Sequence, residues 1–275
     1  MRRNRSLFCL FGMIVFATFP VRAQTTTTTT NTSSLEKDFF KNILQDQKAI
    51  WTAPLHLRRN DAKWVIPGSI GLMALFTTDR MTGDEIAEFD RQVKASRIVS
   101  RAGSVYGLGA VAGAFYFVGR NKANDRARET GLLSAEALVD SLIVGSALKE
   151  ITQRGRPFIG VERSEFFDGG SSFPSGHSTQ AWDVATVLAN EYQHHRAVQI
   201  AAYGMASAVS VARFTVKKHY LSDVVAGSAL GFGIGKYVYN AHHRDGSAGE
   251  SAWPMITPQY NRRAREYGIG LTWSF

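Results

Sequence analysis

The chain has 275 residues, of which 44% are hydrophobic and 20% are charged, a composition typical of a packed protein and not of a disordered one. Its formal net charge is +9, but four arginines lie in the first 23 residues without any acidic residue, and the remainder carries 28 basic against 23 acidic side chains, a net of +5. This modest excess does not indicate nucleic-acid binding, and because the single cysteine, Cys9, lies in the same N-terminal segment, the rest of the chain has no disulfide, thiol nucleophile or cysteine metal site.

Residues 1–23 have the pattern of a secretory signal peptide. Three arginines precede an apolar run from Leu7 to Phe19, and Val21-Arg22-Ala23 follows as a small-residue cleavage site. An uncleaved anchor helix is the alternative, and both interpretations predict that the rest of the chain is exported. Residues 24–34, with six consecutive threonines, have the composition of a polar linker that need not fold.

Residues 35–245 are expected to form one helical domain. Apolar residues recur at helical spacing or in long uncharged runs, and no sustained alternating pattern competes with them. The sequence therefore predicts an all-α bundle of six or more helices. The expected helical segments are 38–51, 64–76 with an interruption at Pro67, 102–119, 132–148, 178–192, 197–212 and 224–235.

Glycines spaced four residues apart allow close contact between helices. They occur at Gly109 and Gly113, and again at Gly227, Gly231 and Gly235. Such contacts form in water and in a bilayer alike, so they do not decide where the bundle resides.

The relation of the bundle to a membrane has two interpretations. A spanning helix needs roughly 20 apolar residues, and the run at 102–119 approaches that length while the others are shorter or carry charges. The mean hydropathy of the chain is −0.14. These values favour a periplasmic globular protein, and a bundle embedded in the inner membrane with its site facing the periplasm is the alternative.

Residues 246–275 form a predicted C-terminal tail. Large apolar and small residues alternate from Tyr267 to Phe275, which predicts a strand. Residues 255–260 could pair with it, but only as an edge strand, because they contain Pro258. We expect a small hairpin and not part of an outer-membrane barrel, since one strand pair cannot form a barrel.

The stretch 213–223 carries the first candidate site residues. Arg213, His219 and Asp223 are separated by five and three residues. On a helix, His219 and Asp223 would share one face, so that the carboxylate could hold one ring nitrogen and leave the other basic. Taken alone, this spacing favours a surface ion pair.

Two earlier clusters add cationic and polar groups. In the first, Lys149 is followed after six residues by Arg156-Pro157, which alone would be a basic helix terminus. The second is the turn 174–177, Pro-Ser-Gly-His, which precedes a predicted helix. The backbone N–H groups of Ser175, Gly176 and His177 could bind an anion there, although an N-capping serine is the simpler interpretation. Together the three clusters supply the groups that bind a phosphate without a metal.

The three clusters, in this order and with this internal spacing, resemble the signature motifs of the type 2 phosphatidic acid phosphatase and vanadium haloperoxidase superfamily. The resemblance covers residues 149–223. It departs at Ala212, where the family usually has a serine before the arginine. That change removes a hydroxyl beside the expected phosphate position and leaves the chemical residues in place.

The resemblance implies a role for each site residue. His219 would attack phosphorus and form a phosphohistidine. Asp223 would hold the other ring nitrogen, and His177 would protonate the leaving group and then activate water. The residues implied to bind the phosphate oxygens are Lys149, Arg156, Ser175, Gly176 and Arg213.

The implied function is that of an exported, metal-independent phosphatase acting on phosphate monoesters or pyrophosphates. A lipid phosphate such as phosphatidic acid, or an isoprenyl pyrophosphate, is the expected substrate, so membrane association stays open. The alternatives are a nonspecific soluble acid phosphatase, a haloperoxidase in which vanadate takes the phosphate position, and a non-catalytic anion-binding envelope protein. No cofactor and no nucleic-acid partner are expected.

Other polar residues are expected to be structural. His194-His195 and His242-His243 lie near helix C-termini, where a partly charged imidazole suits the helix dipole. Asp79 carries no site signal, and Asp183 is expected to face solvent.

Overall fold

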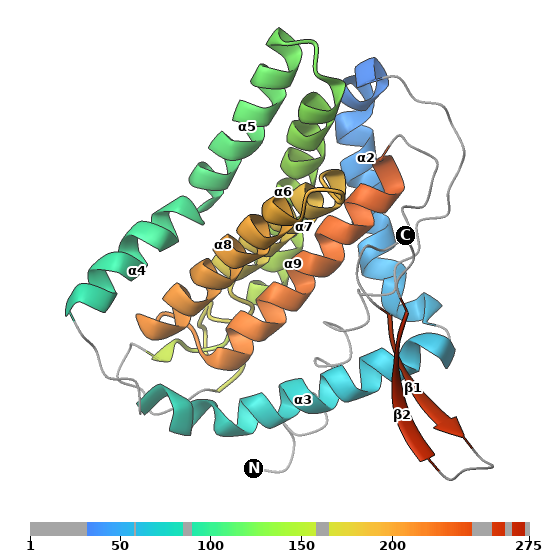
Figure 1. Ribbon diagram of the computed structural model, residues 1–275. Coiled ribbons are helices and arrows are strands. Elements are labelled where there is room, and N and C mark those ends of the chain that lie inside the picture. The colour runs from blue at the N-terminus through green and yellow to red at the C-terminus, as the bar shows by residue number, and fades with distance from the viewer. Residues whose placement is uncertain are drawn as a thin grey trace.

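The computed structural model describes residues 32–57, 59–84, 90–157, 165–243, 255–261 and 266–272. The predicted signal peptide and most of the predicted linker lie outside these residues. The described part contains eight α-helices and one 3-10 turn, so the predicted all-α bundle is confirmed there (Figure 1). The helices are α2 (Thr32–Thr52), η1 (Ala53–His56), α3 (Arg59–Asp84), α4 (Asp90–Ala102), α5 (Val105–Asn121), α6 (Asp125–Thr152), α7 (Gly176–Glu191), α8 (Arg196–Thr215) and α9 (Leu221–His242).

Two strands follow the helices. β1 (Met255–Asn261) pairs antiparallel with β2 (Glu266–Thr272), and Pro258 lies opposite Ile269 in that register.

Local sequence explains where several helices begin and end. Asn124 caps α6 by accepting a hydrogen bond from the Ala127 N–H at 3.1 Å, and α6 ends at Gln153, which adopts the left-handed conformation. The uncharged run at 102–119 is broken, because Ser104 caps a new helix, α5. The expected interruption at Pro67 is wrong: Pro67 lies inside a continuous α3. Its position is exposed, so water can bind the carbonyl that the proline leaves without an N–H partner.

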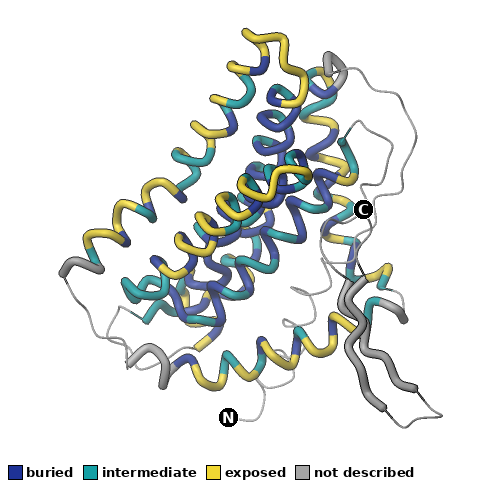
Figure 2. The backbone as a smooth tube through the Cα atoms, viewed as in Figure 1, coloured by how far each residue is buried: buried dark blue, intermediate teal, exposed yellow. Residues whose placement is uncertain are grey.

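Helices α6, α7 and α9 form the centre of the bundle, where Figure 2 shows most of the buried backbone. Their side chains share one hydrophobic core, to which Leu133 and Val144 of α6, Val187 of α7, and Leu230 and Ile234 of α9 contribute. Helices α3, α4 and α5 lie outside this centre and carry exposed residues along their length.

A stripe of glycines on α9 sets the close approach of α7. A Cβ added to Gly231 would lie 2.0 Å from the Thr179 carbonyl oxygen, and one added to Gly235 would lie 2.4 Å from that of Asp183. Both positions therefore exclude any side chain, as the glycine spacing predicted. No such close contact forms at Gly109 and Gly113, where an added Cβ would meet nothing within 4 Å.

Within the described residues, one helix has the length and apolar composition needed to cross a membrane. It is Asp125–Thr152, and 61% of its most apolar window is buried inside the bundle. The segments 93–102 and 105–121 would together make a second, although they meet at a 46° bend. Core helices of soluble proteins share these properties.

Helix α3 crosses the end of the bundle at which α9 begins (Figure 1). Its buried face includes Val65, Leu72 and Asp79. Trp64 and Ile70 are 72% and 63% exposed, so its outer face is also apolar. This helix therefore has apolar surface both toward the bundle and away from it.

Candidate active site

The second and third motifs meet where α7 and α9 begin. The Ser175 N–H donates a hydrogen bond to the Asp223 carbonyl oxygen at 3.0 Å. That N–H was expected to face an anion, and this expectation is wrong because the loop is tied to α9 instead. Ser175 occupies the N-cap position of α7, and its Oγ accepts a hydrogen bond from Ser178 at 3.1 Å. The Gly176 and His177 N–H groups lie in the first turn of α7, where they have no partner within the helix.

His219 lies just before α9 and not on it, but its expected pairing with Asp223 is present, with Nδ1 3.7 Å from Asp223 Oδ2. Tyr220 caps the helix, and Asp223 in the first turn accepts a hydrogen bond from the Tyr220 N–H at 2.9 Å. The His219 ring is nevertheless held: its Nδ1 lies 2.8 Å from the Ser172 carbonyl oxygen and 3.7 Å from Asp223 Oδ2. A carbonyl can only accept a hydrogen bond, so Nδ1 carries the proton and Nε2 is the basic nitrogen.

Arg154 anchors this arrangement, although the sequence analysis did not single it out. Its side chain is fully buried, with Nη1 2.5 Å from Asp223 Oδ1 and Nη2 2.7 Å from Asp79 Oδ2. Aromatic rings surround the guanidinium, and the Tyr220 ring centroid is 4.4 Å from its central carbon. One cation thus lies between two buried carboxylates in an aromatic cage.

Asp79, for which no site role was expected, links α3 to this centre. Besides Arg154, its carboxylate accepts hydrogen bonds from the backbone N–H and the hydroxyl of Ser222. The only sequence signal was a single carboxylate on the buried face of an otherwise apolar helix. Its partners lie 75 and 143 residues away, so no local pattern could identify them.

The Asp223 carboxylate stays ionised despite its burial. Burial raises the pKa of Asp223, but the Arg154 guanidinium, His219 and a hydrogen bond from the Ser172 hydroxyl bring it below its ordinary value. Burial lowers the pKa of His219, and the hydrogen bond and charge of Asp223 only partly oppose this. His219 therefore tends to be neutral, as an attacking nitrogen must be.

The cationic residues of the first and third motifs surround the turn of the second. A Cβ added to Gly176 would lie 3.1 Å from Lys149 Nζ. The Arg156 Nη2 lies 3.3 Å from the Ser171 hydroxyl. Arg213 has a buried Nε with no hydrogen-bond partner. Burial and the charges of Arg156 and Arg213 lower the pKa of Lys149, which shows that these three cations lie close enough to repel one another.

The His177 imidazole is strongly perturbed by these cations. Burial lowers its pKa to about 4, and the charges of Arg213, His219, Lys149 and Arg156 add to the shift. His177 is therefore neutral at pH 7 when no anion is bound. An anion bound among the cations would offset their charges and raise this pKa again.

A cleft of about 420 Å³ opens beside His177 and Arg213. Arg97 and Arg101 of α4 and Lys218 also line it, and the Ser100 hydroxyl in its wall is buried without a hydrogen-bond partner. None of the described residues that line the cleft is acidic. The cleft can therefore receive an anionic group, and its lining joins Arg97 and Arg101 of α4 to the motif residues His177 and Arg213.

One residue outside the site, Asp183, differs from expectation. Asp183 is fully buried, so the expectation that it faces solvent is wrong, and burial raises its pKa well above the ordinary value. Ala212, which departs from the family pattern, is buried on α8 immediately before Arg213. His194 and His195 are exposed, in keeping with a surface role.

Comparisons with known proteins agree with the motif pattern. Residues 130–247 match the sequence model of the PAP2 superfamily, and this range contains all three motifs. The lipid A 1-phosphatase of Porphyromonas gingivalis is 34% identical over 70 residues, which are 25% of this chain and 16% of that protein. The matched region thus spans about a sixth of the curated relative's length.

A solved structure is also similar. It is the transmembrane PAP2 type phosphatidylglycerolphosphate phosphatase from Bacillus subtilis, with 22% sequence identity and a TM-score of 0.44. The alignment covers 73% of this chain and 92% of that one.

Proposed function

We propose that this chain, whose residues 130–247 match the PAP2 superfamily model, is an exported, metal-independent phosphatase of that superfamily that hydrolyses a lipid phosphate monoester or pyrophosphate. One observation carries the proposal. The charges of Lys149, Arg156, Arg213 and His219 all act on His177, beside a cleft without acidic lining among the described residues. A nucleophile, a proton carrier and several cations around one point are the parts that phosphoryl transfer requires.

In the first step, Nε2 of His219 attacks phosphorus in line with the leaving oxygen. A P–N bond forms as the P–O bond breaks, and the product is a phosphohistidine with its Nδ1 proton still in place. The Ser172 carbonyl and the Asp223 carboxylate, 2.8 and 3.7 Å from Nδ1, stabilise the positive charge that develops on the ring.

His177 supplies and recovers the proton. The dianionic phosphate neutralises the surrounding cations, so the pKa of His177 rises from its low value and the ring takes up a proton. It gives this proton to the leaving alkoxide. In the second step the neutral ring accepts a proton from the water that attacks phosphorus, which releases phosphate and restores His219.

The remaining motif residues bind the phosphate oxygens. Arg156 and Arg213 offer bidentate guanidinium groups, and Lys149 offers a point charge next to Gly176. The Gly176 and His177 N–H groups at the start of α7 add backbone donors. These groups stabilise the charge of the transition state without a metal ion. Ser175 would hold the loop in place and would not bind phosphate through its N–H, since that N–H donates a hydrogen bond to the Asp223 carbonyl oxygen.

Exposed apolar residues on the helix that supplies Asp79 support a lipid substrate. Trp64 and Ile70 lie on the outer face of α3, which crosses the end of the bundle where Asp79 meets Ser222. Leu55 in η1 is 82% exposed and extends the same kind of surface. This surface would lie on the periplasmic side of a membrane and place the site near lipid headgroups.

The cationic cleft narrows the substrate class. Arg97 and Arg101 lie on α4, outside the three motifs, and can bind an anion that is not the one being hydrolysed. The structure thus favours a pyrophosphate, or a lipid headgroup with a second phosphate, over a simple monoester.

The test is phosphate release by the full chain in the presence of a chelator. Phosphatidic acid, an isoprenyl pyrophosphate and p-nitrophenyl phosphate would be compared in detergent micelles, with His219→Gln as the matched inactive variant. We expect the lipid substrates to react fastest and a labelled phosphate to be trapped on the wild-type protein alone. Full turnover by His219→Gln would contradict the mechanism. Bromide oxidation with vanadate and peroxide, without phosphate release, would favour the haloperoxidase alternative.

A further inference from the structure

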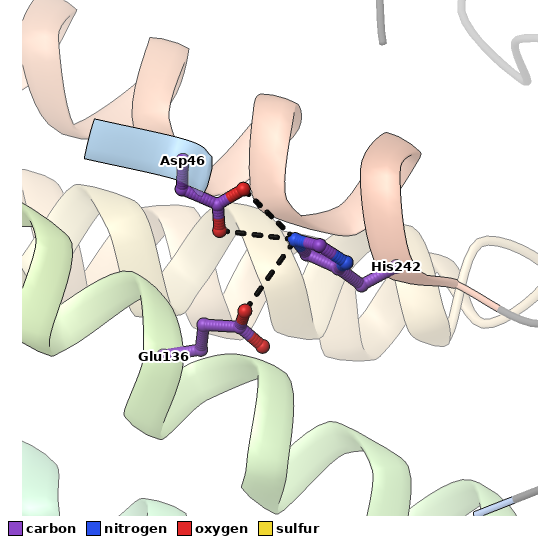
Figure 3. A group of neighbouring side chains, drawn as sticks. All are labelled: Asp46, Glu136 and His242. Carbon is purple, nitrogen blue, oxygen red and sulfur yellow. Dashed lines mark hydrogen bonds and ion pairs between the residues drawn. The ribbon is translucent and has the colours of Figure 1, made fainter. Parts of the chain in front are cut away.

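A second cluster of polar residues lies inside the bundle, away from the candidate active site. Asp46 of α2, Glu136 of α6 and His242 of α9 point toward one another (Figure 3). His242 Nε2 lies 2.9 and 3.0 Å from the two Asp46 oxygens and 3.4 Å from Glu136 Oε1. Glu136 precedes Lys149 by 13 residues on α6, which corresponds to about 20 Å along the helix axis.

The cluster has more carboxyl groups than basic groups, and one of its acceptors is unsatisfied. Glu136 is 1% exposed, and its Oε1 atom, which faces His242, has no hydrogen-bond partner. The carboxyl of Asp140 lies beside that of Asp46, and its Oδ2 atom is also buried without a partner. Two buried carboxyl groups, those of Asp46 and Glu136, thus share one imidazole.

A neighbouring cluster provides a comparison. His243 Nδ1 lies 3.2 Å from Glu129 and 3.1 Å from Glu191. In the described structure neither glutamate leaves a buried oxygen without a partner. The His243 imidazole therefore satisfies this cluster, whereas the Glu136 oxygen that faces His242 stays without a hydrogen bond.

We propose that Asp46, Glu136 and His242 bind one divalent transition-metal ion, Zn²⁺ in preference to Mg²⁺ or Ca²⁺. Their donor atoms all lie within 4.8 Å of one another. Tetrahedral Zn²⁺ with bonds of about 2.0–2.1 Å places its ligand atoms roughly 3.3 Å apart, close to the separations in this cluster. An imidazole donor suits Zn²⁺ and disfavours the oxygen-binding Mg²⁺ and Ca²⁺.

Charge balance also favours a dication. Two ionised carboxylates neutralise Zn²⁺, and a neutral His242 binds it through Nε2 with its proton on Nδ1.

The role of such an ion is structural. It would join α2 to α6 and α9, where Gln47 already donates a hydrogen bond to Asp140 at 2.8 Å. The distance from Lys149 keeps it out of the phosphoryl-transfer site, so this inference does not depend on the proposed function.

The test measures metal in the full chain. The protein is stripped with a chelator, incubated with Zn²⁺ alone, dialysed and analysed by mass spectrometry for bound metal. We expect about one tightly bound Zn²⁺ per chain and a higher Tm than in the stripped protein. Mg²⁺ and Ca²⁺ should give neither effect. Absence of retained Zn²⁺ in the wild-type chain would overturn the proposal.

Matched variants separate this site from adventitious binding at the exposed His194-His195 pair. Glu136→Gln preserves side-chain volume and should retain less than a tenth of the wild-type Zn²⁺, as should His242→Ala. His243→Ala and a His194→Ala/His195→Ala double variant should retain all of it. Equal Zn²⁺ in Glu136→Gln and the wild type would show that the three side chains form an ion-pair cluster only. If His242→Ala does not fold, the tetrahedral absorption bands of the Co²⁺-substituted wild type, lost in Glu136→Gln, decide the same question.

Discussion

The Nδ1 atom of His219 lies 2.8 Å from the carbonyl oxygen of Ser172, closer than the 3.7 Å that separates it from Asp223. A backbone carbonyl cannot be removed by substitution, so it holds the ring tautomer in every variant of Asp223. The charge of Asp223 contributes separately, by stabilising the ring as it becomes cationic and by pairing with Arg154.

Substitution of Asp223 should therefore reduce activity less than substitution of His219. We expect Asp223→Asn to lower kcat by about 10²–10³-fold, the range for loss of one stabilising group in an active site, while His219→Gln abolishes turnover. Steady-state kinetics of both variants, with circular dichroism to verify folding, check this. An equal loss of kcat in the two variants would contradict this prediction, because it would mean that His219 cannot attack without Asp223.

Arg154 should be important for stability as well as for the site. Arg154→Met leaves Asp79 and Asp223 buried without their cation, and breaking a buried ion pair in this way destabilises a protein by about 3–5 kcal/mol. Denaturant-induced unfolding of the variant and the wild type measures the difference in their free energies of unfolding. Arg196→Met, an exposed arginine at the start of α8, is the matched control and should change stability by less than about 0.5 kcal/mol.

Anion binding should be coupled to proton uptake by His177. Sulfate keeps the same charge between pH 5 and 8, so any pH dependence of its affinity comes from protonation of groups on the protein. Since a bound anion raises the pKa of His177 from about 4, sulfate should bind more tightly as pH falls. Calorimetry in buffers of different ionisation enthalpy measures the uptake, which should be smaller in His177→Asn. An unchanged proton uptake in that variant would exclude His177 as the proton carrier.

Arg97 and Arg101 should select substrates with a second anionic group. Loss of one exposed charge contact is expected to raise KM by about 3–10-fold for a pyrophosphate substrate, because such contacts contribute on the order of 1 kcal/mol. Arg97→Gln and Arg101→Gln should leave the KM for p-nitrophenyl phosphate nearly unchanged. An equal rise in KM for both substrates would contradict this, because it would mean that the two arginines attract any anionic substrate without contacting a second phosphate.

The glycines of α9 and α5 should respond oppositely to alanine. Gly231→Ala would place a Cβ 2.0 Å from the Thr179 carbonyl oxygen, so we expect a loss of about 1–3 kcal/mol from overpacking. Gly109→Ala meets nothing within 4 Å and should stabilise α5 by up to about 1 kcal/mol. Thermal unfolding compares the two, and a stable Gly231→Ala variant would contradict the close approach of α7 and α9.

Much of the helical architecture could be predicted because it depends on local patterns. Uncharged or amphipathic runs identified most of the helices, but the observed ends differ from the predicted ones. For example, α9 continues to His242, whereas its predicted end was residue 235. The helical segment at 64–76 was predicted, but its continuity across Pro67 was not, since whether a proline ends a helix depends on its exposure in the folded state. The motif residues were identified by spacing and family resemblance, which do not require knowledge of the fold.

By itself the sequence determined the all-helical class, the order of the three motifs and the residue types that they bring to an anion. These follow from spacings of a few residues, which the chain geometry converts directly into helices and turns. Only the tertiary structure decided that Arg154 joins Asp79 to Asp223, that Ser172 holds the His219 ring, and that Asp46, Glu136 and His242 meet. The residues of these contacts lie 47 to 196 positions apart in the sequence. Their contacts therefore arise from helix packing, which local periodicity does not encode.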